Sequence, residues 1–141
     1  MRIFKAQILS MLLVLAAPAH AAVVDCELTL LSATLTATGN GSVIALPKKP
    51  FGTFYATATY NSGTTATLDM TIQTCPTSAS ASCVSTGQTF TQCTTSTCYV
   101  DGGEGIDFAN ANVLSYARIA YTLSGTAPNY TVAVYYCSGG R

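Results

Sequence analysis

The stretch Thr65–Thr74, with the sequence TATLDMTIQT, carries the clearest structural signal in the chain. Apolar side chains recur there at every second position, at Ala66, Leu68, Met70 and Ile72. Because successive side chains of a β-strand point to opposite faces of a sheet, this alternation predicts a strand with one buried face and one solvated face. Such one-sided strands are typical of antiparallel sheets.

The same alternation recurs on both sides of this stretch. It predicts further strands at residues 27–38, 42–46, 52–60, 83–92, 113–123 and 130–137, separated by turns that include residues 61–63 and 124–129. We also predict a bulge at Leu30-Leu31, a glycine-rich loop over residues 101–107 and an edge strand over the polar residues 83–92. The chain is therefore expected to be all-β: a single antiparallel β-sandwich, jelly-roll-like, of about eight short strands.

The first 21 residues resemble a secretory signal peptide. Arg2 and Lys5 precede an apolar run of ten residues, Ile8–Ala17, and Ala19-His20-Ala21 fits the small-x-small cleavage pattern. A membrane-spanning helix needs about 20 apolar residues, so we expect a cleaved signal over residues 1–21 rather than an anchor. Residues 22–141 are then one exported domain, located outside the cell, at its surface or in the periplasm, with no membrane insertion after cleavage.

Six cysteines lie in residues 22–141, an even number that predicts disulfides in an oxidising compartment. Cys26 and Cys137 lie near the two ends of the domain, and such ends are often neighbours. The other four flank the short polar stretches PTSASAS and TTST. We predict that disulfides reinforce the sandwich at Cys26–Cys137, Cys75–Cys83 and Cys93–Cys98. The alternative pairs Cys83 with Cys93 and Cys75 with Cys98, as cross-strand bridges.

Charge and histidine content exclude several classes of function. The chain has six basic and six acidic side chains and a net charge of 0, whereas nucleic-acid binding needs a basic field. Nucleic acid is therefore not an expected partner. The one histidine, His20, belongs to the expected signal peptide. Without histidine, the exported domain cannot use Ser-His-Asp or Cys-His catalysis or a histidine-ligated metal, so we expect a protein that is not an enzyme.

Three segments carry a resemblance to known modules: TATGNGSVIAL at 36–46, GTTATLDMTIQT at 63–74 and SYARIAYTLSGTAPNYTVAV at 115–134. Together they resemble small jelly-roll-like β-sandwich modules of tailed-phage virion proteins and of bacterial secreted and surface proteins. The resemblance spans most of the exported domain and implies a structural or adhesive role without catalytic residues. Phage modules lack a signal peptide and generally lack these cysteines, so the resemblance implies a secreted relative rather than a virion part.

Three acidic residues form a first candidate site. Asp101, Glu104 and Asp107 lie close together in the expected glycine-rich loop, and carboxylate oxygens are the ligands that Ca²⁺ prefers. The EF-hand spacing is absent, so a solvated turn is the alternative to a calcium site. The same acids could serve a glycosidase, but that reaction needs two carboxyls at a fixed distance in a cleft. No cofactor other than Ca²⁺ is indicated.

Three tyrosines form a second candidate site. Tyr55, Tyr116 and Tyr135 occupy the outward phase of three predicted strands. Aromatic faces can stack on sugar rings, with Asp69 or Arg118 as polar neighbours. The alternative is that these tyrosines pack at a subunit contact or cover a sheet edge.

Composition favours association. Residues 22–141 contain 22 threonines and 11 serines but few charges, and charged side chains are what normally oppose contact between exposed strands. We expect a structural or adhesive module that self-associates through an edge strand such as 83–92, or packs on a surface or matrix. The alternative function is a carbohydrate-binding module that uses the outward tyrosines.

Overall fold

The computed structural model describes residues 25–47, 52–99, 104–108 and 114–138, apart from the side chains of Asp25, Glu27, Glu104, Ile106–Phe108 and Ser138. The expected signal peptide and Asp101 lie outside these residues. The described residues form a 3-10 helix, η1 (Ser80–Ser82), and the strands β1 (Asp25–Leu35), β2 (Gly39–Asn40), β3 (Ile44–Ala45), β4 (Gly52–Cys75), β5 (Val84–Thr89), β6 (Cys93–Thr94), β7 (Glu104–Phe108) and β8 (Tyr116–Ser138). The expected all-β class is confirmed, and every strand pair is antiparallel.

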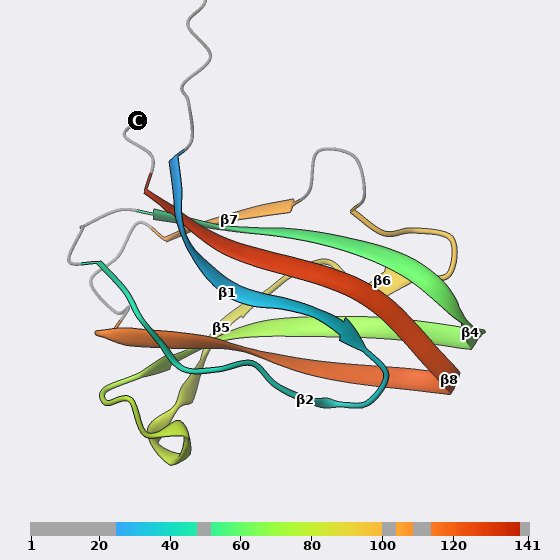
Figure 1. The fold of residues 1–141 in the computed structure, drawn as a ribbon, viewed down its shortest axis with the longest axis horizontal. Helices are drawn as coiled ribbons and strands as arrows, with labels where there is room; N and C mark the ends of the chain where they lie inside the picture. Colours follow the sequence, from blue (N-terminus) through green and yellow to red (C-terminus); the bar gives the residue numbers. More distant parts are fainter. Residues whose placement is uncertain (1–24, 48–51, 100–103, 109–113, 139–141) are drawn as a thin grey trace, which may run out of the picture.

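Two long strands, β4 and β8, form the centre of the sheet. They comprise 24 and 23 residues and pair from Thr53 opposite Cys137 to Cys75 opposite Tyr116. The register shifts only between residues 60 and 67 of β4, where both strands bend together (Figure 1). The turns predicted at 61–63 and 124–129 are therefore wrong: each is a corner within one continuous strand. Because the two strands bend side by side, their backbones go on pairing through the corner.

Positive φ angles mark this corner at Gly63, Thr65, Gly125 and Ala127. Gly125 has a φ of 93°, and a Cβ atom there would lie 2.6 Å from the carbonyl oxygen of Thr64 and 2.7 Å from that of Thr65. Glycine is therefore required at position 125 both for the backbone angle and for the space.

The corner divides the sheet into two halves that lie one above the other (Figure 1). In the β1 half, the order of the strands across the sheet is β7, residues 52–60 of β4, residues 130–138 of β8, and β1. In the β5 half, β5 and β6 pair with the second part of β4, and β2 and β3 pair with the first part of β8. Strands that were predicted as separate short elements are thus parts of one folded sheet.

One apolar cluster draws on both halves. Its fully buried members include Phe54, Ala56 and Val134 from the β1 half and Met70, Ile72 and Ile119 from the β5 half. The predicted alternation of Thr65–Thr74 is confirmed, with its apolar residues inside. The predicted bulge at Leu30-Leu31 is also confirmed, since the β1–β8 register shifts between Thr29 and Leu31. The shift lets both leucines face the interior, where they are 3% and 8% exposed.

The three predicted disulfides are confirmed. Cys26–Cys137 joins β1 to β8, Cys75–Cys83 joins the end of β4 to the start of β5, and Cys93–Cys98 closes the loop after β6. The described cysteines are all bonded, so the alternative pairing is excluded. Disulfides of this kind are typical of an oxidising environment.

Two predictions about the second half of the chain need correction. Part of the expected loop 101–107 is a strand: Glu104–Phe108 is β7, paired with residues 52–56 of β4. Its glycines and acids have low strand propensity, but an unpaired β4 edge offers backbone partners that override propensity. The predicted strand 83–92 ends at Thr89 as β5, because Phe90 turns into the core. Its position at an edge of the sheet is confirmed.

Candidate functional site

The outer face of the β1 half carries a regular array of hydroxyl groups. Its rows run across β4, β8 and β1: Tyr55, Tyr135 and Thr29; then Thr57, Ala133 and Ser32; then Thr59, Thr131 and Thr34. We call these nine residues the hydroxyl face. Neighbouring strands lie about 4.8 Å apart, and each side chain of the hydroxyl face is exposed or half-buried. Eight of the nine carry a hydroxyl group, the exception being Ala133, and none is charged, so this surface is neutral and hydrogen-bonding.

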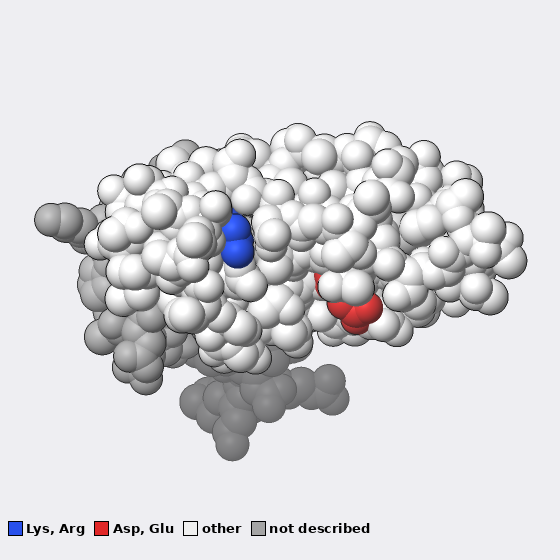
Figure 2. All heavy atoms as spheres, turned by 90° about the horizontal axis from the view of Figure 1, so that it is seen from below, with Lys and Arg blue, Asp and Glu red and all other residues white. Residues whose placement is uncertain are grey.

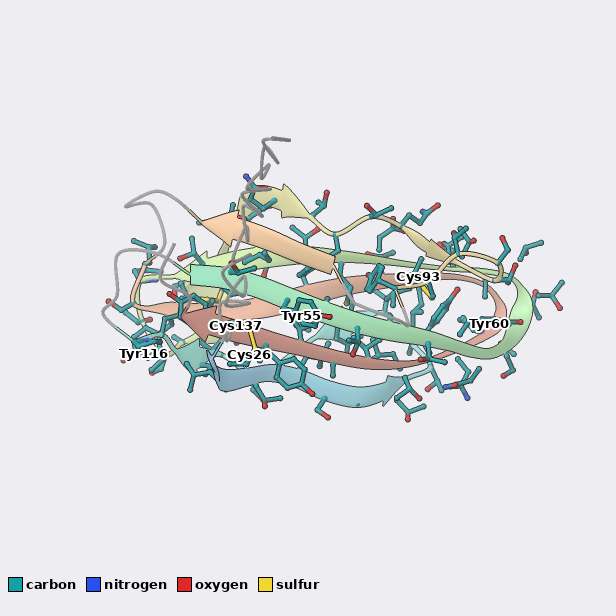
Figure 3. The ribbon with its side chains drawn as sticks, turned by 90° about the horizontal axis from the view of Figure 1, so that it is seen from above. Cys26, Tyr55, Tyr60, Cys93, Tyr116 and Cys137 are labelled. Carbon is teal, nitrogen blue, oxygen red and sulfur yellow. A yellow bond between two sulfur atoms is a disulfide. The ribbon has the colours of Figure 1, made fainter. Side chains whose placement is uncertain are left out.

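Two of the predicted ligand-binding tyrosines come together on this face. Tyr55 and Tyr135 stand directly opposite each other in the β4–β8 register, and both are half-buried. Figure 3 shows Tyr55 on the first part of β4, beside β8. Directly opposed residues of an antiparallel pair have Cβ atoms about 5 Å apart, so the two tyrosines are neighbours at the end of the array nearest Cys26 and Cys137.

The other three predicted residues lie elsewhere. Tyr116 opens β8 in the β5 half, opposite Cys75, and Figure 3 labels it at the end of the molecule away from the corner. Asp69 and Arg118 also belong to the β5 half. Residues at outward-facing positions of different strands can lie on different outer faces of the molecule once the sheet bends. The five predicted residues therefore do not form one site.

Asp69 and Arg118 are each held by a glutamine. The Gln92 amide donates hydrogen bonds of 2.8 and 3.0 Å to the Asp69 carboxylate. The Arg118 Nε donates a 2.6 Å hydrogen bond to the Gln73 side-chain oxygen, directly across the β4–β8 ladder. These contacts connect neighbouring segments of the sheet. Figure 2 shows the molecule from the side of the β5 half, and the charged residues form only small areas among uncharged residues there.

The acidic candidate site is divided between described and undescribed residues. Asp101 lies outside the described residues, and Glu104 and Asp107 belong to β7. Within the described ranges, no group of three or more histidine, cysteine, aspartate or glutamate side chains could hold a metal ion. Calcium binding at these three positions stays a prediction.

The corner contains a polar cluster that the sequence analysis missed. The Asn61 amide donates 2.9 Å hydrogen bonds to the Asn129 side-chain oxygen and to the Thr131 hydroxyl. These contacts connect β4 to β8 where their register shifts. Only the repeated pairing of tyrosine with asparagine, at 60–61 and 129–130, marks this cluster in the sequence.

Beneath the corner, the half-buried Tyr60 packs against a second tyrosine, Tyr130. The rings of Tyr60 and Tyr130 meet edge to face, with centroids 5.6 Å apart, and the Tyr60 hydroxyl donates a hydrogen bond to the Gly63 carbonyl. Tyr130 is fully buried, and its hydroxyl has no hydrogen-bond partner among the described residues. Burial raises the pKa of Tyr130 above its usual value, and the nearby Tyr60 and Asp69 raise it further.

Comparison with family models, curated proteins and solved structures found no match for this chain. Within the residues that the structure describes, no helix has the length and apolar character needed to cross a membrane.

Proposed function

We propose that this chain is a secreted, non-enzymatic structural or adhesive module that assembles with copies of itself or packs on a surface or matrix. The observation that carries the proposal is the hydroxyl face, a set of neutral side chains regularly spaced on a sheet whose disulfides fix its shape. A neutral array of this kind presents no electrostatic repulsion to a second copy.

Asp69 and Arg118, the predicted polar neighbours of the tyrosines, are engaged in hydrogen bonds within the fold. Both form these bonds to glutamine amides that link strands, and the residues from 22 onward contain no histidine. These features support a role carried by the surface rather than by a reaction centre.

We further infer that the two halves close as a jelly-roll-like β-sandwich, related to the surface and virion modules that the sequence resembles. The apolar cluster shared by both halves supports this closure. Export is supported by the three disulfides. Intact-mass analysis of exported protein should give a chain that begins at Ala22, with all six cysteines oxidised; a chain that keeps residues 1–21 or free thiols would contradict the proposal.

Sedimentation velocity over a range of protein concentrations tests the assembly. The expected result is a weight-average sedimentation coefficient that rises with protein concentration and depends little on salt, because the hydroxyl face carries no charge. A protein that stays monomeric at every concentration would overturn self-association.

A second candidate function is carbohydrate binding, which the opposition of Tyr55 and Tyr135 favours. Two neighbouring aromatic rings beside hydroxyl groups suit the apolar face and the hydroxyls of a sugar. On a glycan array, the double variant Tyr55→Ala/Tyr135→Ala should lose binding while Tyr116→Ala, a tyrosine on the other half, keeps it. Equal binding by both variants would contradict a site at this pair, and an array without bound glycan would contradict the function itself.

A further inference from the structure

Exposed strand edges present unpaired N–H and C=O groups, and proteins usually protect such edges with charges, bulges or very short strands. Each half of this sheet has a described strand or strand pair at both edges. The β1 half ends in β7 and β1, and the β5 half ends in β5 with β6 and in β2 with β3. The protection of these edges differs, and the difference identifies where a second strand can add.

Three of the edges are protected. β7 contains two acidic residues among its five, Glu104 and Asp107, which repel a second copy of the same strand. β2, β3 and β6 have only two residues each. Such strands offer too few backbone groups to template an added strand.

β5 is protected by a bulge and by its own side chains. Its register against β4 shifts between Thr71 and Gln73, and Gly87 adopts a φ of 78°. The backbone N–H groups of Gly87 and Gln88 donate to the hydroxyls of Ser85 and Thr86, at 3.1 and 3.2 Å. These N–H groups already have partners, and a bulged strand cannot align with a flat one. The expected association through residues 83–92 is therefore disfavoured by the structure.

The stretch Leu31–Leu35 of the β1 edge lacks all of these features, because the acidic residues and the register shifts of β1 lie before it. β1 has 11 residues and pairs with β8 alone, and Figure 3 shows it as the outermost strand of its half. Its register with β8 is regular from Leu31 to Leu35, and this stretch contains no charged residue, proline or glycine. Among the described residues, no backbone hydrogen bond outside the β8 ladder involves Leu31–Leu35.

We infer that the Leu31–Leu35 edge of β1 is the surface through which two copies of this chain associate, as antiparallel strands related by a two-fold axis. This inference rests on the proposed self-association and names its contact. The two copies would share one continuous sheet, because the β1 strands of both copies would lie side by side. The hydroxyl faces of both copies would then form one continuous surface.

The sequence of this edge is complementary to itself. A two-fold axis through Ala33 places Ser32 opposite Thr34 of the second copy and Leu31 opposite Leu35 of the second copy. Ser32 and Thr34 are exposed, whereas Leu31 and Leu35 are buried against the core. Hydroxyl groups therefore meet hydroxyl groups on the outer side, while the leucines stay in the core of their own copy. Cross-strand pairs of hydroxyl side chains are favourable.

The test compares two double variants that add the same charge. Ser32→Lys/Thr34→Lys places like charges directly opposite each other across the two-fold axis, which destabilises antiparallel pairing. Val84→Lys/Thr89→Lys adds the same two charges to exposed positions of β5, and Val84 is 56% exposed. Sedimentation equilibrium gives the dimer dissociation constant of wild type and both variants, and circular dichroism checks that each variant is folded.

The expected result is a dissociation constant at least about tenfold higher for the β1 variant and unchanged for the β5 variant. Should the double β1 variant fail to fold, Thr34→Lys alone replaces it, with a smaller increase of the same sign. If wild type dimerises and the β1 variants dimerise equally well, the inference is wrong while self-association stands. Loss of dimer only in the β5 variant assigns the contact to β5 instead. A monomeric wild type overturns the proposed self-association and, with it, this contact.

Discussion

The disulfide between Cys26 and Cys137 should stabilise the fold more than either of the other two disulfides. It closes a loop of 111 residues, whereas Cys75–Cys83 and Cys93–Cys98 close loops of 8 and 5 residues. A cross-link restricts the unfolded chain, and the chain-entropy stabilisation grows with the logarithm of loop length. At 25 °C these loops correspond to about 4.8, about 2.5 and about 2.1 kcal/mol.

The three bonds are well matched for comparison. Each joins one cysteine with 0% exposure to a more exposed partner; the buried members are Cys137, Cys75 and Cys93. Replacement of both cysteines by alanine therefore removes a similar amount of buried sulfur in each case. The cavity contributions largely cancel between variants, and the difference of about 2.3 kcal/mol or more between the long loop and each short loop remains.

Guanidinium unfolding of the three double alanine variants, followed by circular dichroism, gives their free energies of unfolding by linear extrapolation. The variant without Cys26 and Cys137 should unfold at the lowest denaturant concentration and have the largest m value, because its unfolded chain is the most expanded. Equal losses for all three variants, or a larger loss from either short loop, would refute the reasoning from loop length.

Further predictions concern the corner and the buried tyrosines. Gly125→Ala should lower the free energy of unfolding by at least about 2 kcal/mol, because the added Cβ meets backbone oxygens. Gly87→Ala, at a positive φ with open space around it, should cost about 1 kcal/mol; equal costs in urea titrations would contradict the clash. Tyr130→Phe removes a buried hydroxyl that has no partner among the described residues and should raise stability by about 1 kcal/mol, whereas Tyr60→Phe loses its hydrogen bond and should lower stability by a similar amount. A destabilised Tyr130→Phe variant would show that the hydroxyl is satisfied. Because folding raises the pKa of Tyr130, the folded state binds the phenol proton more tightly than the unfolded state does. This contribution to the free energy of unfolding is complete below about pH 10 and is lost as pH rises through the folded pKa. Unfolding free energies measured from pH 8 to 11 should fall more steeply for wild type than for Tyr130→Phe, and parallel curves would contradict this.

Local pattern determined much of this protein. Alternation along single strands identified the buried residues of Thr65–Thr74 and the bulge at Leu30-Leu31. Both features depend only on which face of the sheet a side chain occupies, and an alternation with a period of two residues indicates that face directly. The cysteine pairs also followed from local spacing and from the nearness of the domain ends.

Tertiary structure alone decided how these strands are joined and which outward residues become neighbours. The sequence signals a turn at 61–63 in the same way whether the chain reverses or bends, and only the pairing of β4 with β8 through that region distinguishes the two. Once the sheet bends, outward-facing residues of its two halves lie on opposite sides of the molecule. Tyr55 therefore lies opposite Tyr135 in the β4–β8 register, while Tyr116 lies on the other half. The protection of an edge likewise depends on register against a partner strand, as in β5. Contacts between residues far apart in sequence leave no periodic signal in one chain, because every strand offers the same backbone N–H and C=O groups to any strand that comes beside it.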